Sequence, residues 1–357
     1  MDKSFYVIIM YILIHTGFIL FLYPENIIES TSQGHWLPIM MQVAFHLIIF
    51  VLFIKALQYF PTEEDIISIY TKAGKMIAIL MLLPMLLYYL FVMILKVRSY
   101  SEIITIVFLS QTPLWAIMAL VLGIASYLAV KGVESIFRTG LLVFILLFPL
   151  ITFSLVVSFQ NVDWHYIYPL WVEDFSFLTN KSYYISYFAV GGGFLFLGFI
   201  RPFVAFQSKK ILYTVVAIIP LFLIAVYIPI LTFGQATAST FLFPFVVTID
   251  AVNLTWVMFD RITVFFLLSI FIFILLFLSL VFWIVVRILS RCFPSKTQPI
   301  YIVLPVSILI YSICLSIPNW EDLEKLFVWT TILEFYVIIV VPISIILLGL
   351  RLKVAGK

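Results

Sequence analysis

The stretch YFAVGGGFLFLGF, residues 187–199, places three consecutive glycines in the middle of a segment that is apolar enough to cross a lipid bilayer. Glycine costs about 1 kcal/mol relative to alanine inside a helix, so the run Gly191–Gly193 needs a structural reason. Close helix packing through small residues is one explanation. Three adjacent glycines face three different directions, however, and Gly198 alone could serve such packing. The pattern therefore favours a helix that is broken inside the membrane.

The composition indicates that the whole chain is a membrane protein. Of its 357 residues, 65% are hydrophobic and 10% are charged, whereas a typical globular domain has about 25% charged residues. Most apolar runs are near the ~20 residues that a membrane helix needs, and they do not alternate as barrel strands do. We therefore expect an all-α integral membrane protein, with residues 1–357 forming a single polytopic membrane domain.

Apolar runs between turn and charge signals predict ten transmembrane helices. Their expected ranges are Phe5–Tyr23, Trp36–Leu57, Met76–Leu109, Leu114–Val130, Leu141–Phe159, Tyr183–Ile200, Ile211–Leu231, Ile262–Val286, Ile300–Ile317 and Leu326–Leu350. Charged residues interrupt the third range, which is either one long tilted helix or a span followed by a short outer helix.

The distribution of basic residues predicts the orientation. If the amino terminus is cytoplasmic, fifteen of the 20 lysines and arginines fall on the inner side. Only Lys181, Arg261 and Lys325 fall on the outer side, and the third span holds the other two. By the positive-inside rule, both termini are expected to be cytoplasmic.

The ten spans divide into two sets of five, about residues 1–160 and 183–357, which would be inverted relative to each other. Transporters built from such repeats bind their ligand near the bilayer midplane, where the first helix of each half is broken. The first span has His15-Thr16-Gly17 just past its middle, and the sixth has the three glycines at its middle. We therefore expect broken helices 1 and 6, with a site suited to small zwitterions or polar nutrients.

Residues at the two predicted breaks are the candidate ligand-binding residues. Two aromatic side chains precede the glycines and could wall a pocket. For His15, a hydrogen bond to a neighbouring helix is an equally good explanation. The candidate set comprises His15, Thr16, Gly17, Tyr187, Phe188, Gly191, Gly192 and Gly193.

Ionisable residues within predicted spans are functional candidates. Arg98 and Glu102 have the spacing of a helical ion pair, which leaves Lys96 as a partner for a carboxylate or as a gate charge. Alternatively, all three lie near the outer headgroups and extend toward them. Glu334 could carry a proton or a cation, or it could be a hydrogen-bonded packing residue.

Other site types have little support in the sequence. Cys292 and Cys314 are far from any metal-ligand spacing, and no HExxH, GxSxG, P-loop or CxxC motif occurs. We therefore expect no metal site, no cofactor and no enzymatic activity. The formal net charge of +3 is too small to indicate a nucleic-acid partner.

Several longer motifs resemble a known family when their order and spacing are considered together. They are YPENIIESTSQGHWL (23–37), VRSYSEIITIVFLSQTP (97–113), KGVESIFRTG (131–140), NVDWHYIYPLW (161–171), FGQATASTFLFPF (233–245) and FDR (259–261). With them the chain resembles the spore-germination permease family, the B subunits of Ger-type nutrient germinant receptors. This family belongs to the amino acid/polyamine/organocation transporter superfamily.

The resemblance implies a LeuT-like fold with a site between the first, third, sixth and eighth helices. It also implies residence in the spore inner membrane, an A-type membrane subunit and a C-type lipoprotein subunit as partners, and an amino acid, nucleoside or sugar as ligand. Where the family usually has Glu-Arg at the start of the eighth span, this chain has Asp260-Arg261. That pair is a further candidate for a charge or coupling role.

Three functional hypotheses follow. The chain is a nutrient-sensing receptor subunit, a secondary transporter of amino acids or related small solutes, or a scaffold that only assembles the receptor. Because a ligand site at a broken helix serves a sensor and a transporter equally well, the sequence does not separate the first two.

Overall fold

The computed structural model describes residues 3–107, 109, 111–171, 175–252, 262–292 and 298–355, which form helices joined by loops. Eight of the described helices are long and apolar enough to cross a membrane, or nine if one bent pair counts as a single span. A further apolar helix, Ile300–Ser316, is shorter. The expected all-α membrane protein is thereby confirmed.

The first part of the chain forms seven helices that correspond to the first five predicted spans and one short connecting helix. They are α1 (Lys3–Ile19), α2 (Tyr23–Ser30), α3 (Trp36–Leu57), α4 (Ile66–Ala73), α5 (Lys75–Val107), α6 (Leu114–Lys131) and α7 (Val133–Val157). The third predicted span is one long helix as far as Val107, despite its charged residues. Helix α7 begins well before the predicted Leu141, because Gly132 at φ +91° ends α6 and allows the next helix to start at once.

The second part contains shorter elements as well as long helices. They are η1 (Ser158–Asn161), η2 (Trp164–Ile167), η3 (Ser176–Thr179), α8 (Lys181–Ile185), α9 (Tyr187–Gly191), α10 (Phe196–Ile200), α11 (Ser208–Phe233), α12 (Gln235–Ala238), α13 (Pro244–Asp250), α14 (Ile262–Leu289), η4 (Ser290–Cys292), α15 (Ile300–Ser316) and α16 (Trp320–Ala355).

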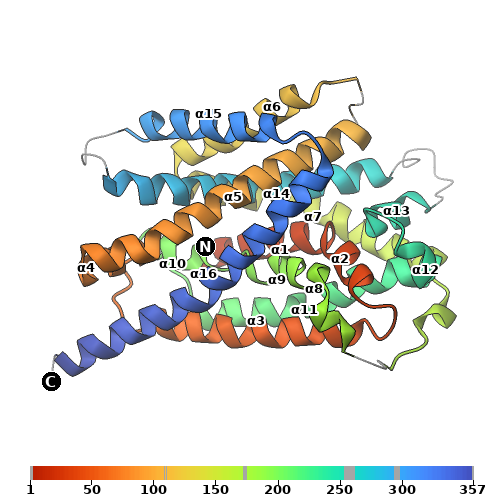
Figure 1. The fold of residues 1–357 in the computed structure, drawn as a ribbon, viewed down its shortest axis with the longest axis horizontal. Helices are drawn as coiled ribbons and strands as arrows, with labels where there is room; N and C mark the ends of the chain where they lie inside the picture. Colours follow the sequence, from red (N-terminus) through yellow and green to blue (C-terminus); the bar gives the residue numbers. More distant parts are fainter. Residues whose placement is uncertain are drawn as a thin grey trace.

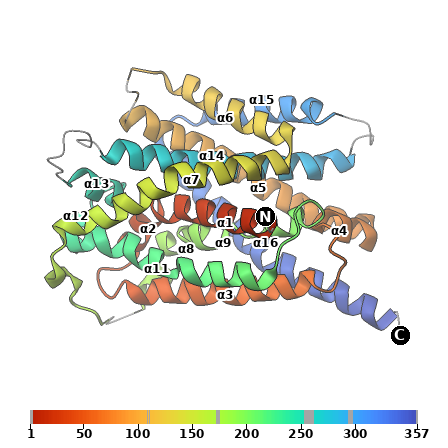
Figure 2. The same ribbon diagram turned by 180° about the vertical axis from the view of Figure 1, so that it is seen from behind.

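The long helices lie roughly side by side along one direction (Figures 1 and 2). Helices α6 and α15 pack together at one edge, and α3 and α11 pack together at the opposite edge. Helix α14 lies between them against α1, α5, α6 and α7, and α16 crosses α3 and α5. We call the end that holds α12 and α13 the α13 end, and the end that holds α4 and the last turns of α16 the α4 end.

The first span is interrupted, but not at the predicted residues. Helix α1 continues through His15-Thr16-Gly17, and the chain bends by 48° between Ile19 and Tyr23, where α2 begins. The prediction placed this break a few residues too early. A Cβ atom at Gly17 would lie 2.9 Å from Ile274 Cδ1 of α14, so this glycine permits close helix packing instead. The bend precedes Pro24, whose ring suits the first turn of a new helix.

The sixth span is interrupted at the predicted glycines. Helix α9 ends at Gly191 and α10 begins at Phe196. A Cβ atom at Gly192 would lie 2.8 Å from the carbonyl oxygen of Phe188, and one at Gly193 would lie 2.7 Å from Cε1 of His15. At both positions a larger residue would force the backbone or a buried ring to move, so these two glycines permit the compact, non-helical connection.

The same segment packs tightly against α4, and this contact gives a first testable prediction. A Cβ atom at Gly198 would overlap Ile66 Cδ1 and lie 3.0 Å from Phe53 Cζ. We expect Gly198→Ala to destabilise the protein by about 1–3 kcal/mol, the usual cost of overfilling a core. Thermal unfolding of the purified protein measures this change.

The matched control is Gly123→Ala in α6, where no atom lies within 4 Å of an added Cβ. In the Ile66→Ala background, Gly198→Ala should lower the free energy of unfolding by clearly less, because the two side chains then no longer compete for the same space. An unchanged unfolding temperature for Gly198→Ala in the native background would contradict this packing.

Candidate ligand-binding cavity

A cavity of about 300 Å³ lies toward the α13 end, between α1 and α2 on one side and α5, α8, α9 and α16 on the others. This volume is at the lower end of the usual range for small-molecule sites, about 300–1,000 Å³. Its lining comprises Phe18, Leu22, Tyr23, Glu25, Asn26, Glu29, Lys96, Tyr100, Lys181, Ser182, Ile185, Ser186, Phe188, Ala189, Trp320, Glu321, Glu324, Lys325, Phe327 and Val328.

Lys96 of α5 lies at the buried end of this cavity inside a group of aromatic rings. Its Nζ lies 4.0 Å from the ring centroid of Phe188, 5.3 Å from that of Phe18, 5.6 Å from that of Phe327 and 6.0 Å from that of Tyr100. Ring faces within about 6 Å attract a cation. These four side chains come from α9, α1, α16 and α5, so the group joins four elements that line the cavity.

The ammonium group of Lys96 is available to a ligand. The residue is 3% exposed, and within the described ranges no hydrogen bond joins its Nζ to another residue. Lysine carries three N–H donors, which ring faces alone do not satisfy. An anionic or strongly hydrogen-bond-accepting group that entered the cavity would therefore find a positive charge and free donors at its floor.

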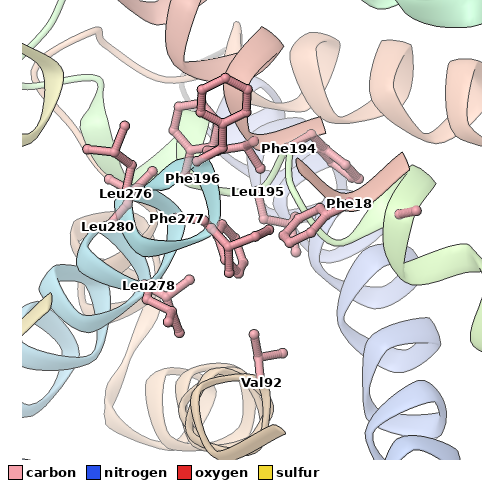
Figure 3. Packing of buried hydrophobic residues seen from close by; sticks show 14 of the residues in the cluster. Phe18, Val92, Phe194, Leu195, Phe196, Leu276, Phe277, Leu278 and Leu280 are labelled. Atoms are coloured by element: carbon pink, nitrogen blue, oxygen red, sulfur yellow. The ribbon is translucent and has the colours of Figure 1, made fainter. Parts of the chain in front are cut away.

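Three phenylalanines close the floor toward the centre of the bundle. Phe18 contacts Phe188 with ring centroids 4.8 Å apart and contacts Phe277 of α14 with centroids 4.7 Å apart. Phe18 and Phe277 point toward each other in the core (Figure 3). The cavity consequently stops at these rings, before the glycine interruption of the sixth span.

The mouth of the cavity is exposed and rich in carboxylates. Glu25 and Glu29 stand one turn apart on α2, and Glu321 and Glu324 lie on the first turns of α16. Glu29 Oε2 accepts a hydrogen bond of 2.7 Å from the hydroxyl of Ser182, which ties α2 to α8. The exposed Lys181 and Lys325 also line the cavity, and Lys325 pairs with Asp322. Four carboxylates against these two lysines leave the mouth acidic and the floor basic, an arrangement that matches a molecule with one positive and one negative end.

His15 faces the glycine interruption from α1. Its Nδ1 donates to the carbonyl oxygen of Tyr11 at 2.9 Å, and its ring stacks on that of Tyr11. The Tyr11 hydroxyl lies 3.0 Å from Nε2 of His46. His15 Nε2 lies at the interruption, 3.0 Å from the position of a Cβ atom at Gly193. His15, Tyr11 and His46 line a second, much smaller cavity of about 10 Å³.

The predicted ligand-binding residues are distributed over two places. Phe188 lines the large cavity, whereas His15 and the three glycines meet at the interruption of the sixth span. Thr16 and Gly17 are buried residues of α1, and Gly17 packs against α14. Tyr187 packs on Phe335 of α16 and Phe45 of α3, outside the cavity. The expectation of a site between the first, third, sixth and eighth predicted helices stays a prediction. The cavity itself is lined by α1, α2, α5, α8, α9 and α16, and Phe277 of α14 lies behind Phe18.

The predicted charged residues also separate into groups. Arg98 and Glu102 form the expected ion pair at 2.6 Å, and Arg98 is buried and donates to the carbonyl oxygen of Ile317. Lys96 is buried in the cavity floor, and Glu334 is fully buried in α16. Lys96 and Arg98 are thus enclosed by protein, which does not fit the headgroup alternative. Asp260 and Arg261 lie outside the described residues.

Sequence reasoning missed most of the cavity lining. The acidic pair on α2 lies within the motif YPENIIES, and Tyr100 follows Lys96 at helical spacing. Each of these two spacings indicated that its two residues lie on the same face of their own helix. Nothing local indicated that α2, α5 and the first turns of α16 meet, because residues near 25, 96 and 324 come together only through tertiary packing.

Comparison with known proteins places the chain in a family. Residues 2–322 match the sequence model of the family described as spore germination protein. The chain belongs to the spore germination protein family. Within that family it is 26% identical over 246 residues to spore germination protein B2 of Bacillus subtilis (strain 168), a match that covers 68% of this chain and 66% of that protein. The match thus spans slightly less than two thirds of the relative.

The fold of this family member is also similar to that of a solved structure. The crystal structure of MhsT in complex with L-phenylalanine matches with a TM-score of 0.63, covering 98% of each chain at 12% sequence identity. At this identity the likeness concerns the fold alone. It confirms the expected LeuT-like architecture.

Proposed function

We propose that this chain is the nutrient-sensing membrane subunit of a spore germinant receptor. It binds a small nutrient in the cavity between α1, α2, α5, α8, α9 and α16, and the bound nutrient shifts the helix bundle toward one conformation. Partner subunits respond to that shift and trigger germination. Coupling of this kind requires only that the nutrient bind one conformation more tightly than the other.

The observation that carries this proposal is the buried ammonium group of Lys96 at the floor of an open cavity. A buried charge without a hydrogen-bonded partner is costly, so its retention favours a role in binding. The carboxylates at the mouth supply the opposite charge. An amino acid fits this arrangement with its carboxylate at Lys96 and its ammonium group toward Glu25 or Glu324, whereas a sugar or nucleoside would use hydroxyl or base acceptors at the same lysine.

Family membership supports the cellular setting. We propose residence in the spore inner membrane with both termini cytoplasmic, so that the α4 end is the inner end and the cavity opens outward. The proposed partners are an A-type membrane subunit and a C-type lipoprotein subunit. The proposal includes no enzymatic step and no cofactor.

The transporter-type fold favours one alternative, secondary transport of amino acids or related small solutes. Uptake by the purified chain in proteoliposomes separates the two functions. A panel of radiolabelled amino acids, nucleosides and sugars is tested for binding and for accumulation, with and without an ion gradient. For a sensor we expect saturable binding without concentrative accumulation. Accumulation against a gradient without any partner subunit would establish transport and contradict the pure sensor.

A further inference from the structure

Glu334 of α16 is a buried carboxylate that the proposed nutrient cavity does not use. Its side chain is 0% exposed, and neither carboxylate oxygen has a hydrogen-bond partner among the described residues. It does not line the cavity and forms no ion pair within the described ranges. A fully buried ionised carboxylate in this condition would be very unfavourable, so it requires a positively charged partner.

Glu334 lies beside the interrupted sixth span, close to its backbone. A Cβ atom at Gly191 would lie 3.5 Å from Glu334 Oε1 and 3.4 Å from Ile338 Cδ1. The Phe188 carbonyl of α9 still accepts from the N–H of Gly192 at 3.0 Å. Because α9 ends at Gly191, the carbonyl groups after Phe188 have no continuing helix to supply N–H partners. Carboxylate and carbonyl oxygens are the ligands that hard cations prefer.

The helices packed against α16 bring titratable and aromatic groups to Glu334 and to the neighbouring Phe335. Helix α5 contributes Lys96 and Tyr88, which interact electrostatically with Glu334, and the buried Tyr88 hydroxyl has no hydrogen-bond partner among the described residues. Helices α8 and α9 present Tyr184 and Tyr187 to the adjacent Phe335, and α3 presents Phe45 there. Lys96 is the charged group among them, and its ammonium lies over the Phe188 ring rather than in an ion pair with Glu334.

We propose that Glu334 is the binding site for a small monovalent cation, a proton or an alkali metal ion, beside the glycine interruption. The cation neutralises the carboxylate between α16 and α9 and holds the interrupted span against α16. The site is separate from the nutrient cavity, and the inference rests on Glu334 and its surroundings rather than on the proposed function.

Thermal unfolding of the purified full-length chain in lipid nanodiscs, without nutrient, tests this site. One arm compares sodium, potassium and N-methylglucamine chloride at equal ionic strength and fixed pH. The other arm varies pH in N-methylglucamine chloride. A bound cation stabilises the folded state according to its concentration relative to its dissociation constant. We expect the unfolding temperature to rise by a few degrees with alkali cation in the first arm or with acidification in the second.

Substitutions identify the binding group. Glu334→Gln should abolish the rise in unfolding temperature in the arm where the native protein shows it. Glu134→Gln, which changes an exposed carboxylate on α7, should keep the full rise. Glu334→Asp retains a carboxylate on a side chain that is one methylene shorter. It should shift the rise in unfolding temperature to a higher cation or proton concentration. This variant keeps the test informative if Glu334→Gln folds poorly. A full response in both Glu334 variants, or a native protein that responds in neither arm, would overturn the proposal.

Discussion

The Lys96→Met substitution is expected to raise the nutrient concentration for half-maximal germination by about 10- to 150-fold. Methionine keeps the length and the apolar stem of lysine but removes the charge and all three donors. A hydrogen bond to a charged group contributes about 1.5–3 kcal/mol, and each 1.4 kcal/mol is a tenfold change in affinity. Spores that carry the variant as their only receptor of this type, exposed to a nutrient that activates the native chain, provide the measurement.

The control for this prediction is Lys131→Met at the end of α6, an exposed lysine far from the cavity. Protein abundance in the spore membrane must be equal for both variants and the native chain. We expect Lys131→Met to respond as the native chain does. If Lys96→Met at normal abundance kept the native dose dependence, Lys96 would have no part in nutrient binding.

The Arg287→Met substitution is expected to cause the largest loss of stability among the single changes considered. Arg287 of α14 donates to Asp65 Oδ2 at 2.5 Å, and the Asp65 side chain is 1% exposed. Asp65 also caps α4 by accepting from the backbone N–H of Ser68 at 2.8 Å. The Arg287 side chain is 31% exposed, but its removal leaves the Asp65 charge buried without its partner. The loss of one partner of a buried pair costs up to about 3–5 kcal/mol. Thermal or detergent-induced unfolding measures this loss.

Two comparison variants separate the ion pair from other effects. Asp65→Asn keeps an oxygen for the helix cap but removes the charge, so Arg287→Met should cost much less in that background. Glu134→Gln breaks an exposed pair with Arg138, whose side chains are 65% and 76% exposed, and should cost about 0–1 kcal/mol. Equal losses of unfolding stability in Arg287→Met and Glu134→Gln would show that the Asp65–Arg287 pair does not hold α4 against α14.

The fold could be predicted largely because membrane helices have strong local signals. Each predicted span overlaps one described helix or a run of shorter ones, and α9 ends at Gly191, where three adjacent glycines indicated an interruption. The break in the first span lies beyond Gly17, because that glycine meets α14 closely, and no local pattern distinguishes packing from a break. The division into two inverted repeats stays a prediction.

The site could be predicted only in part. Lys96 and Phe188 were candidates because a charge in a membrane span and an aromatic ring beside a break are unusual in themselves. The acidic mouth and the contribution of α16 depend on which helices are neighbours, and no periodicity within one helix carries that information. The pair Asp65–Arg287 joins residues more than two hundred positions apart and had no local signal either.

The most direct test of the account is a structure of the native chain determined with an activating nutrient bound. We predict that the nutrient lies on the mouth side of Phe18 and Phe188, with an acceptor atom within about 3.2 Å of Lys96 Nζ. A nutrient bound instead on the far side of these rings, between His15 and Gly193 and with Lys96 still surrounded by its aromatic rings, would contradict the assignment of the cavity.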